Sequence, residues 1–222
     1  MTPHKIIQNY IPLVRFLGQA LGEHYEIVLH DFSSPESSVV AIENGFLSGR
    51  HKGAAMTNLV LKMLQHEHDQ DGEDPESLLN YVSTGLAGQV FNSSTFFIRD
   101  EKHNSIGAIC INMNTQPIRD AIKALQMFGA GSGQDLQQPK ASPSPQESLT
   151  GSAEETMDAL FETVRLKHAH NVAPSASDKQ EFIRDLVLEG AFLFKGSIPY
   201  IAKKISMSES TLYRYIAKVK QD

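Results

Sequence analysis

Residues 129–151 restrict the fold of this chain more than any other feature, because they divide it in two. The segment reads GAGSGQDLQQPKASPSPQESLTG, which has no hydrophobic periodicity and consists largely of Gly, Ser, Pro and Gln. A flexible coil of this length has an r.m.s. reach of roughly 25 Å. We therefore predict a flexible linker that tethers residues 1–128 to residues 152–222 without fixing their relative placement.

The composition is that of a globular protein. Of the 222 residues, 41% are hydrophobic and 21% are charged, unlike the composition of a disordered chain. No run approaches the ~20 apolar residues of a membrane span. The N-terminal MTPHKIIQNYIPLVRF lacks the pattern of a signal peptide, and a single cysteine cannot form an internal disulfide. We expect a cytoplasmic protein without membrane contact.

The part before the linker mixes helices and strands. Pro3 and a run of apolar residues at helical spacing predict an amphipathic helix that Thr2 caps and Gly22 ends. A second helix is predicted around MTNLVLKMLQHE. Helices against a meander of about five short strands indicate an α+β sensor-like module and not a parallel α/β enzyme. Four segments have strand character, namely 25–32, 38–45, 93–100 and 105–114.

Two amphipathic helices are predicted at the start of the part after the linker. Ser152 with Glu155, and Ser177 with Gln180, have the spacing of capping boxes before apolar residues at helical intervals. The first of these helices, residues 154–168, is a candidate for dimer contact or signal transmission. Packing within the C-terminal part explains its apolar face equally well.

The segment IPYIAKKISMSESTLYRYIAKVK, residues 198–220, has the spacing of a helix-turn-helix. The small residue Ala202 lies where a second helix must cross the first, SMS forms the turn, and Ser208 is positioned to cap the second helix. We therefore predict an all-α helix-turn-helix domain at about residues 178–220. Its inner face would comprise Ile198, Ile201, Ala202, Ile205, Leu212, Tyr215, Ile216 and Val219.

The side chains that this arrangement leaves outside are types that contact DNA. Hydroxyl groups suit phosphates and base edges, Arg suits guanine, and Lys suits the backbone. Residues 190–222 hold six Lys or Arg against two acidic residues, although the whole chain has a net charge of −6. The predicted DNA-binding residues are Lys203, Lys204, Ser208, Ser210, Thr211, Tyr213, Arg214 and Lys218.

An ordinary helical hairpin would show the same apolar pattern. The alternative is therefore a ligand-binding or signalling module whose C-terminal helices contact protein instead of DNA. The small residue, the capped turn, the polar outer face and the local charge together favour DNA. Because one such module reads only a half-site, we expect a homodimer on double-stranded DNA.

Five segments together resemble a known family. They are YEIVLHDF, IENGFLSGRHKG, NSSTFFIRDE, GAICINMN and FLFKGSIPYIAKKISMSESTLYRYI. The chain resembles bacterial transcriptional regulators with an N-terminal YheO-like PAS domain and a C-terminal DauR-like helix-turn-helix, and the resemblance covers most of the chain outside the linker. It implies an antiparallel PAS sheet of about five strands flanked by helices, in a DNA-binding regulator that senses a small-molecule effector or dimerises through this domain.

Three residues of the first part are candidates for contacting an effector. Arg50, between the glycines of SGRHKG, suits a bidentate contact with an anionic group, and a backbone turn explains the motif as well. Asn112 and Asn114 share one face of the strand 105–114 with Cys110. They are candidate pocket residues or strand-end hydrogen-bonding groups.

No residue is assigned a catalytic role. Cys110 lies in no recognisable nucleophile motif, and a thiol on a buried strand is usually a small apolar side chain. The run HEHDQDGEDP, residues 66–75, contains metal-ligating residue types without the spacing of an EF-hand or a zinc site, and it departs from the family pattern. We therefore predict no enzyme activity, no cofactor and no metal.

Overall fold

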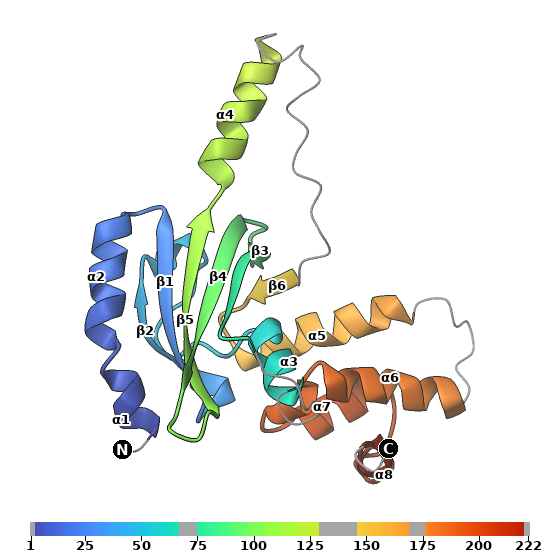
Figure 1. Ribbon diagram of the computed structural model, residues 1–222. Helices are drawn as coiled ribbons and strands as arrows, with labels where there is room; N and C mark the ends of the chain where they lie inside the picture. Colours follow the sequence, from blue (N-terminus) through green and yellow to red (C-terminus); the bar gives the residue numbers. More distant parts are fainter. Residues whose placement is uncertain (1–2, 67–74, 129–145, 169–175, 220–222) are drawn as a thin grey trace.

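A six-stranded sheet forms the centre of the first part (Figure 1). The structure is a computed structural model of the chain and describes residues 3–66, 75–128, 146–168 and 176–219. The strand order is β2-β1-β5-β4-β3-β6, with antiparallel pairing except between β3 and β6. The strands are β1 (Tyr25–Asp31), β2 (Val39–Glu43), β3 (Ser77–Gly85), β4 (Val90–Arg99), β5 (Ser105–Asn114) and β6 (Gln146–Leu149).

The predicted α+β class, with a PAS-like sheet and a helical C-terminal region, is confirmed, and the four predicted strands are present as β1, β2, β4 and β5. The sequence does not reveal β3, whose alternation is interrupted near Asn80, a residue with φ of 57°. It also does not reveal β6, which lies inside the expected linker 129–151; residues 129–145 lie outside the described residues. Because β6 pairs parallel with β3, the expectation of an antiparallel sheet is wrong for this pair.

Two short helices cover one face of the sheet over β1 and its neighbours β2 and β5. They are α1 (Pro3–Gln8) and α2 (Ile11–Leu21), where one continuous helix was predicted. The interruption precedes Pro12, which has no amide hydrogen to donate to the preceding turn. α2 ends at Gly22, as predicted, with a left-handed φ of 85°.

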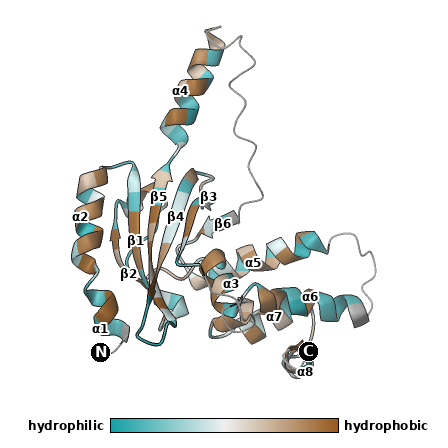
Figure 2. Cartoon of the chain, viewed as in Figure 1, coloured by the Kyte–Doolittle hydropathy of each residue, from teal (hydrophilic) through white to brown (hydrophobic). Residues whose placement is uncertain are grey.

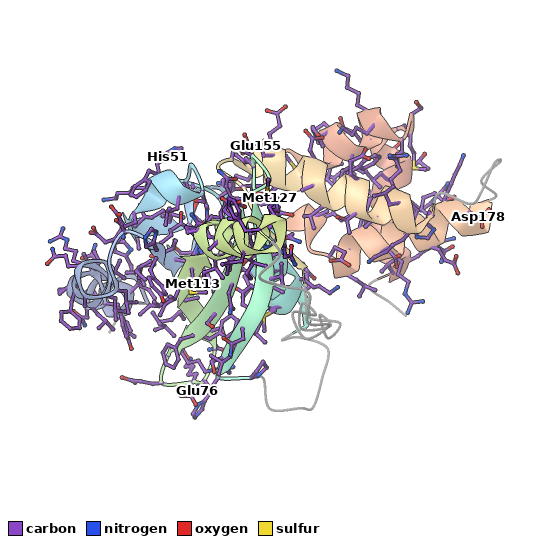
Figure 3. All side chains as sticks on the ribbon, turned by 90° about the horizontal axis from the view of Figure 1, so that it is seen from above. His51, Glu76, Met113, Met127, Glu155 and Asp178 are labelled. Atoms are coloured by element: carbon purple, nitrogen blue, oxygen red, sulfur yellow. The ribbon has the colours of Figure 1, made fainter. Side chains whose placement is uncertain are left out.

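The helix α4 (Gln116–Met127) follows β5 and projects beyond the end of the sheet (Figure 1). None of its residues is buried. In the view from above, α4, which carries the labelled Met127, is seen nearly along its axis (Figure 3). The helical region extends to one side of it as far as Asp178.

The C-terminal region is helical, as predicted. Ser152 forms the expected capping box, with the Glu155 amide donating to its hydroxyl at 3.2 Å. The helix predicted after Ser177 begins at Ala176, one residue before the expected cap. The helices are α5 (Ala153–Lys167), α6 (Ala176–Leu188), α7 (Ser197–Lys204) and α8 (Glu209–Val219).

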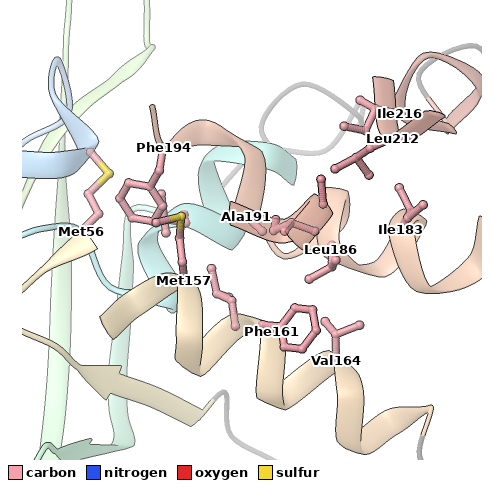
Figure 4. Close-up of a cluster of buried hydrophobic side chains, with 14 of the residues drawn as sticks. Met56, Met157, Phe161, Val164, Ile183, Leu186, Ala191, Phe194, Leu212 and Ile216 are labelled. Atoms are coloured by element: carbon pink, nitrogen blue, oxygen red, sulfur yellow. The ribbon is translucent and has the colours of Figure 1, made fainter. Parts of the chain in front are cut away.

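A single apolar core joins this helical region to the first part. The helix α3 (Asn58–His66) contributes Val60 and Leu61, and the preceding Met56 packs in the same cluster. Figure 4 shows Met56 beside Met157 and Phe194, with the core continuing between α5, α6 and α8. The expected tether would leave the two parts free, whereas the structure packs them together through α3.

Gly190, which follows α6, lies directly against α3. Its φ of 79° is left-handed, and a Cβ at this position would lie 2.9 Å from the Leu61 carbonyl oxygen. Gly196, which precedes α7, has a similar φ of 78°, but its Cβ would meet no atom within 4 Å. Substitution of either glycine strains the backbone, but only substitution of Gly190 also disturbs the contact between the two parts of the chain.

We predict that Gly190→Ala lowers the free energy of unfolding more than Gly196→Ala does. Both variants place alanine in the left-handed region, which costs about 1–2 kcal/mol. Only Gly190→Ala also forces a methyl group against the α3 backbone, which adds about 1 kcal/mol or more. Urea unfolding of the full chain measures both values. Equal losses in the two variants would contradict a tight contact between Gly190 and α3.

Candidate nucleic-acid interface and buried polar site

α7 and α8 cross as the two helices of a helix-turn-helix. Ile201 and Ala202 of α7 and Leu212 and Ile216 of α8 are buried, as predicted for the inner face. Ser206, in the turn, has a left-handed φ of 52°. The following Met207 amide donates to the Ala202 carbonyl at 2.9 Å and closes the end of α7. The turn therefore fixes the angle at which α8 leaves α7.

Ser208 caps α8, as the sequence predicts. Its hydroxyl oxygen accepts from the Thr211 amide at 3.3 Å, and it lies 2.8 Å from the Thr211 hydroxyl and 3.1 Å from that of Ser210. A capped N-terminus presents backbone amides and hydroxyl groups together, which suits phosphate contact.

The outer side of α8 carries the remaining predicted side chains. Ser210, Tyr213, Arg214 and Lys218 are exposed, and Thr211 is half-buried. The Arg214 guanidinium lies 6.0 Å from the centroid of the Tyr215 ring, within the range of a cation–π contact. The structure thus brings hydroxyl, guanidinium and ammonium groups to one helix face, the combination that reads a DNA groove.

The two lysines at the end of α7 differ in their surroundings. Lys203 is exposed, whereas Lys204 forms an ion pair with Asp158 of α5 and lies 5.1 Å from the ring centroids of both Phe161 and Tyr200. The Tyr200 hydroxyl donates to the same carboxylate. Hydrogen bonds from Lys204 and Tyr200 lower the pKa of Asp158. Lys204 therefore attaches α7 to α5, a role that the sequence does not reveal.

A second concentration of polar groups lies on the sheet face opposite α1 and α2. We call it the polar site and define it by Glu26, His30, Arg50, Asn112 and Glu147, all of them buried. Glu26 accepts hydrogen bonds from the Asn112 amide at 2.8 Å and from the Ser48 hydroxyl. The Arg50 guanidinium donates to the Ala55 carbonyl at 2.9 Å.

The two carboxyl groups of the polar site are held away from water. Burial raises the pKa of both Glu26 and Glu147, and the nearby charge of Arg50 offsets part of that rise. Glu147 accepts a hydrogen bond of 2.5 Å from the hydroxyl of Thr57, the residue before α3. The site therefore combines two carboxyl groups with one guanidinium in a region of low dielectric.

Several atoms of the polar site are available for further hydrogen bonds. In the part of the chain that the structure describes, His30 Nε2, Arg50 Nε, Asn112 Oδ1 and Glu147 Oε2 are buried without a hydrogen-bond partner. Burial and the charge of Arg50 lower the pKa of His30 well below its ordinary value, so this imidazole is neutral at neutral pH. The polar site thus contains both buried nitrogen and buried oxygen atoms without a hydrogen-bond partner among the described residues.

The structure groups two of the three residues predicted to contact an effector. Arg50 and Asn112 belong to the polar site. Asn114 does not, because its side-chain oxygen accepts from the Gln116 amide at 3.0 Å, at the start of α4. Sequence reasoning missed Glu26 and Glu147. Glu26 and His30 lie on the same face of the strand formed by YEIVLHDF, and this alternation could have indicated a buried polar pair. Glu147 lies in the expected linker, where no sequence pattern indicated its role.

Cys110 is buried beside the polar site and packs with Val28, Val39 and Ala54. Burial raises the pKa of its thiol to about 12, so it is protonated at neutral pH.

No group of three metal-ligating side chains occurs among the described residues, and residues 67–74 of the acidic run lie outside them. Within the same described ranges, no helix is both long and apolar enough to cross a membrane.

A PAS-like sheet and a helix-turn-helix in one chain are the arrangement of a DNA-binding regulator. The YheO-like PAS domain family matches residues 1–130, and a helix-turn-helix domain family matches residues 156–217. The chain belongs to the family of regulators with a YheO-like PAS domain, as the sequence resemblance implies.

Relatives match over nearly the whole chain. The uncharacterized protein YheO of Escherichia coli (strain K12) is 29% identical over 219 residues, which cover 99% of this chain and 87% of that protein. An uncharacterized protein of Haemophilus influenzae is 27% identical, covering 98% of this chain and 92% of its own length. The transcriptional regulator DauR of Pseudomonas aeruginosa is 25% identical, covering 97% of this chain and 95% of its own.

Two solved structures show a limited likeness. A light-oxygen-voltage domain with a flavin analogue covers 55% of this chain and 96% of its own, at 19% identity and a TM-score of 0.30. A Vibrio cholera VqmA–ligand–DNA complex covers 87% of this chain and 74% of its own, at 13% identity and a TM-score of 0.26. TM-scores of this size are too low to support a functional argument.

We predict that Glu147→Gln raises the free energy of unfolding at neutral pH and that this gain disappears in acid. Because burial raises the pKa of folded Glu147 above that of the unfolded chain, the wild-type protein loses stability as the pH rises through the raised value. Glutamine still accepts from Thr57 and has no charge to bury. Below the unfolded pKa both proteins carry a neutral group, and the difference vanishes.

Urea unfolding of both proteins from about pH 4 to about pH 8 measures this difference. The other titrating groups are common to both and cancel. A gap that does not change with pH would show that Glu147 ionises as easily in the folded as in the unfolded chain.

Proposed function

We propose that this protein is a transcriptional regulator whose helix-turn-helix binds operator DNA and whose PAS-like domain binds a small polar effector at the polar site. The exposed face of α8, with Ser210, Tyr213, Arg214 and Lys218 on one side, carries the proposal. The match to a relative described as a transcriptional regulator supports it. Such a regulator acts in the cytoplasm, where bacterial DNA lies.

In this proposal α8 enters the major groove and its capped N-terminus contacts the backbone. Arg214 is placed for a bidentate contact with guanine, and Lys203 and Lys218 for phosphates. One module reads a half-site, so we propose a homodimer on two half-sites about 34–36 Å apart.

The helix α3 provides a physical route from the polar site to the DNA-binding helices. The Thr57 hydroxyl, just before α3, bonds to Glu147, while Val60 and Leu61 pack among α5 to α8. Lys62 of the same helix forms an ion pair of 3.0 Å with Glu189, the residue after α6. An effector that binds one placement of α3 more tightly than another would shift the placement of α7 and α8.

The alternative is a signalling module whose C-terminal helices contact another protein. The apolar faces of α7 and α8 are already buried in the core, and their exposed sides are polar and basic, which favours DNA. Retention on duplex DNA that falls steeply with added salt distinguishes the two, because phosphate contacts release counterions.

We predict that Arg214→Ala weakens binding to a specific operator by roughly 1–3 kcal/mol. The operator comes from selection of genomic fragments by the purified protein, and fluorescence anisotropy then measures affinity. Arg165→Ala is the matched control, because it removes the same charge from an exposed arginine on α5 that pairs with Glu162. Equal effects of the two substitutions, or unchanged affinity in a folded Arg214→Ala variant, would remove Arg214 from the readout.

We also predict that Lys203 and Lys204 respond differently to alanine substitution. Lys203→Ala should reduce the slope of log affinity against log salt by about one phosphate contact. Lys204→Ala should change that slope less and lower the thermal midpoint more, because Lys204 is paired with Asp158. Binding titrations at several salt concentrations and thermal unfolding test both halves. Identical behaviour of the two variants would contradict the separate roles.

A further inference from the structure

The projecting helix α4 carries an apolar stripe that nothing among the described residues covers. Ile118, Ile122 and Leu125 are 54%, 37% and 54% exposed, and Phe128 beyond the helix end is 88% exposed. Figure 2 shows apolar and polar residues alternating around a helix that stands away from the sheet. An isolated helix of about 12 residues is only marginally stable in water. Burial of the apolar stripe against another helix would therefore stabilise α4.

The stripe has the spacing of a coiled-coil seam. Ile118, Ile122 and Leu125 are separated by four and then three residues, which places them at successive d, a and d positions of a heptad. Asp120 and Met127 fall on the opposite side of the helix. An unbroken apolar seam fits an identical seam in another copy, as in an isologous interface.

We propose that α4 pairs in parallel with α4 of a second copy of this chain and forms the dimer seam. This inference rests on the proposed function for the use of the dimer. α4 leaves one end of the sheet, and α8 lies toward the opposite end of the molecule (Figure 1). A two-fold axis along α4 therefore keeps both α8 helices on the same side, as one stretch of DNA requires. An antiparallel pair would send them to opposite ends.

The charges beside the seam permit this pairing. In a parallel pair, the position of Gln126 faces that of Ala121 in the second copy, so no like charges meet there. The other helix considered for dimer contact, α5, is already occupied, because Met157, Phe161 and Val164 on its apolar face are buried in the shared core. The geometry thus selects α4 over α5 as the contact between copies.

Cysteine cross-linking of the full chain tests the seam. Ile122→Cys places a thiol at the seam, and the native Cys110 is buried and does not compete. Mild oxidation should convert most of this variant into a disulfide-linked dimer on a non-reducing gel. Asp120→Cys, on the opposite side of the same helix, is the matched control and should stay monomeric on the gel. Equal cross-linking of both variants would overturn the seam.

Sedimentation of the full chain provides an independent measurement. We expect a dimer for the wild type, and Ile122→Asp should raise the dimer dissociation constant at least about tenfold. Met127→Asp introduces the same charge at an exposed apolar residue outside the seam and should leave the dissociation constant unchanged. A wild-type monomer, or equal effects of the two substitutions, would overturn the proposal.

Retention of each protein on duplex DNA separates this inference from the proposed function. A dimer that depends on Ile122 but does not bind DNA would keep the seam and reject DNA binding. DNA binding by a wild-type monomer would support DNA binding and reject the seam. If both hold, Ile122→Asp should lose affinity for a two-half-site operator while it retains the weaker affinity for a single half-site.

Discussion

The packing of α3 against both halves of the chain is the constraint on which the rest of the structure depends. Thr57, just before the helix, holds Glu147 of β6, and Leu61 meets the backbone of Gly190 after α6. Val60 and Leu61 are buried among helices from the other half. Full burial of such side chains contributes about 1.5–3 kcal/mol each. A change in the relative placement of the sheet and the helix-turn-helix would therefore disturb the packing of α3.

The packing of α3 links the polar site to the helical region, because Thr57 just before α3 bonds to Glu147. Two carboxyl groups and one guanidinium are costly to bury, and buried charges persist where they are paired or have a use. Here Arg50 offsets part of the cost for Glu26 and Glu147, while one atom each of Arg50, Asn112 and Glu147 has no partner among the described residues. Glu147 belongs both to this site and to the contact with Thr57. A change of charge or hydrogen bonding at Glu147 therefore acts directly on the start of α3.

Local patterns in the sequence predicted the parts of the fold that local patterns control. β1 and β5 have strong strand composition, and the helix-turn-helix follows from apolar spacing with Ala202 and Ser208 at defined positions. β6 could not be predicted in this way, because three of its four residues are polar and the segment forms a strand only by pairing with β3. Glu147 and the Lys204–Asp158 pair were missed for the same reason, since their roles depend on partners distant in the chain. Proline at position 12 gave a signal for the break before α2 that the apolar periodicity concealed.

The proposed function couples DNA binding at α8 to the polar site through α3. Hydrogen exchange of backbone amides, measured with and without operator DNA, tests it most directly, because coupling between two sites is reciprocal. If the two sites are coupled, operator DNA slows exchange in α7 and α8 and also changes it in α3 and β6. Protection confined to α7 and α8, with exchange in α3 and β6 unaltered, would contradict it.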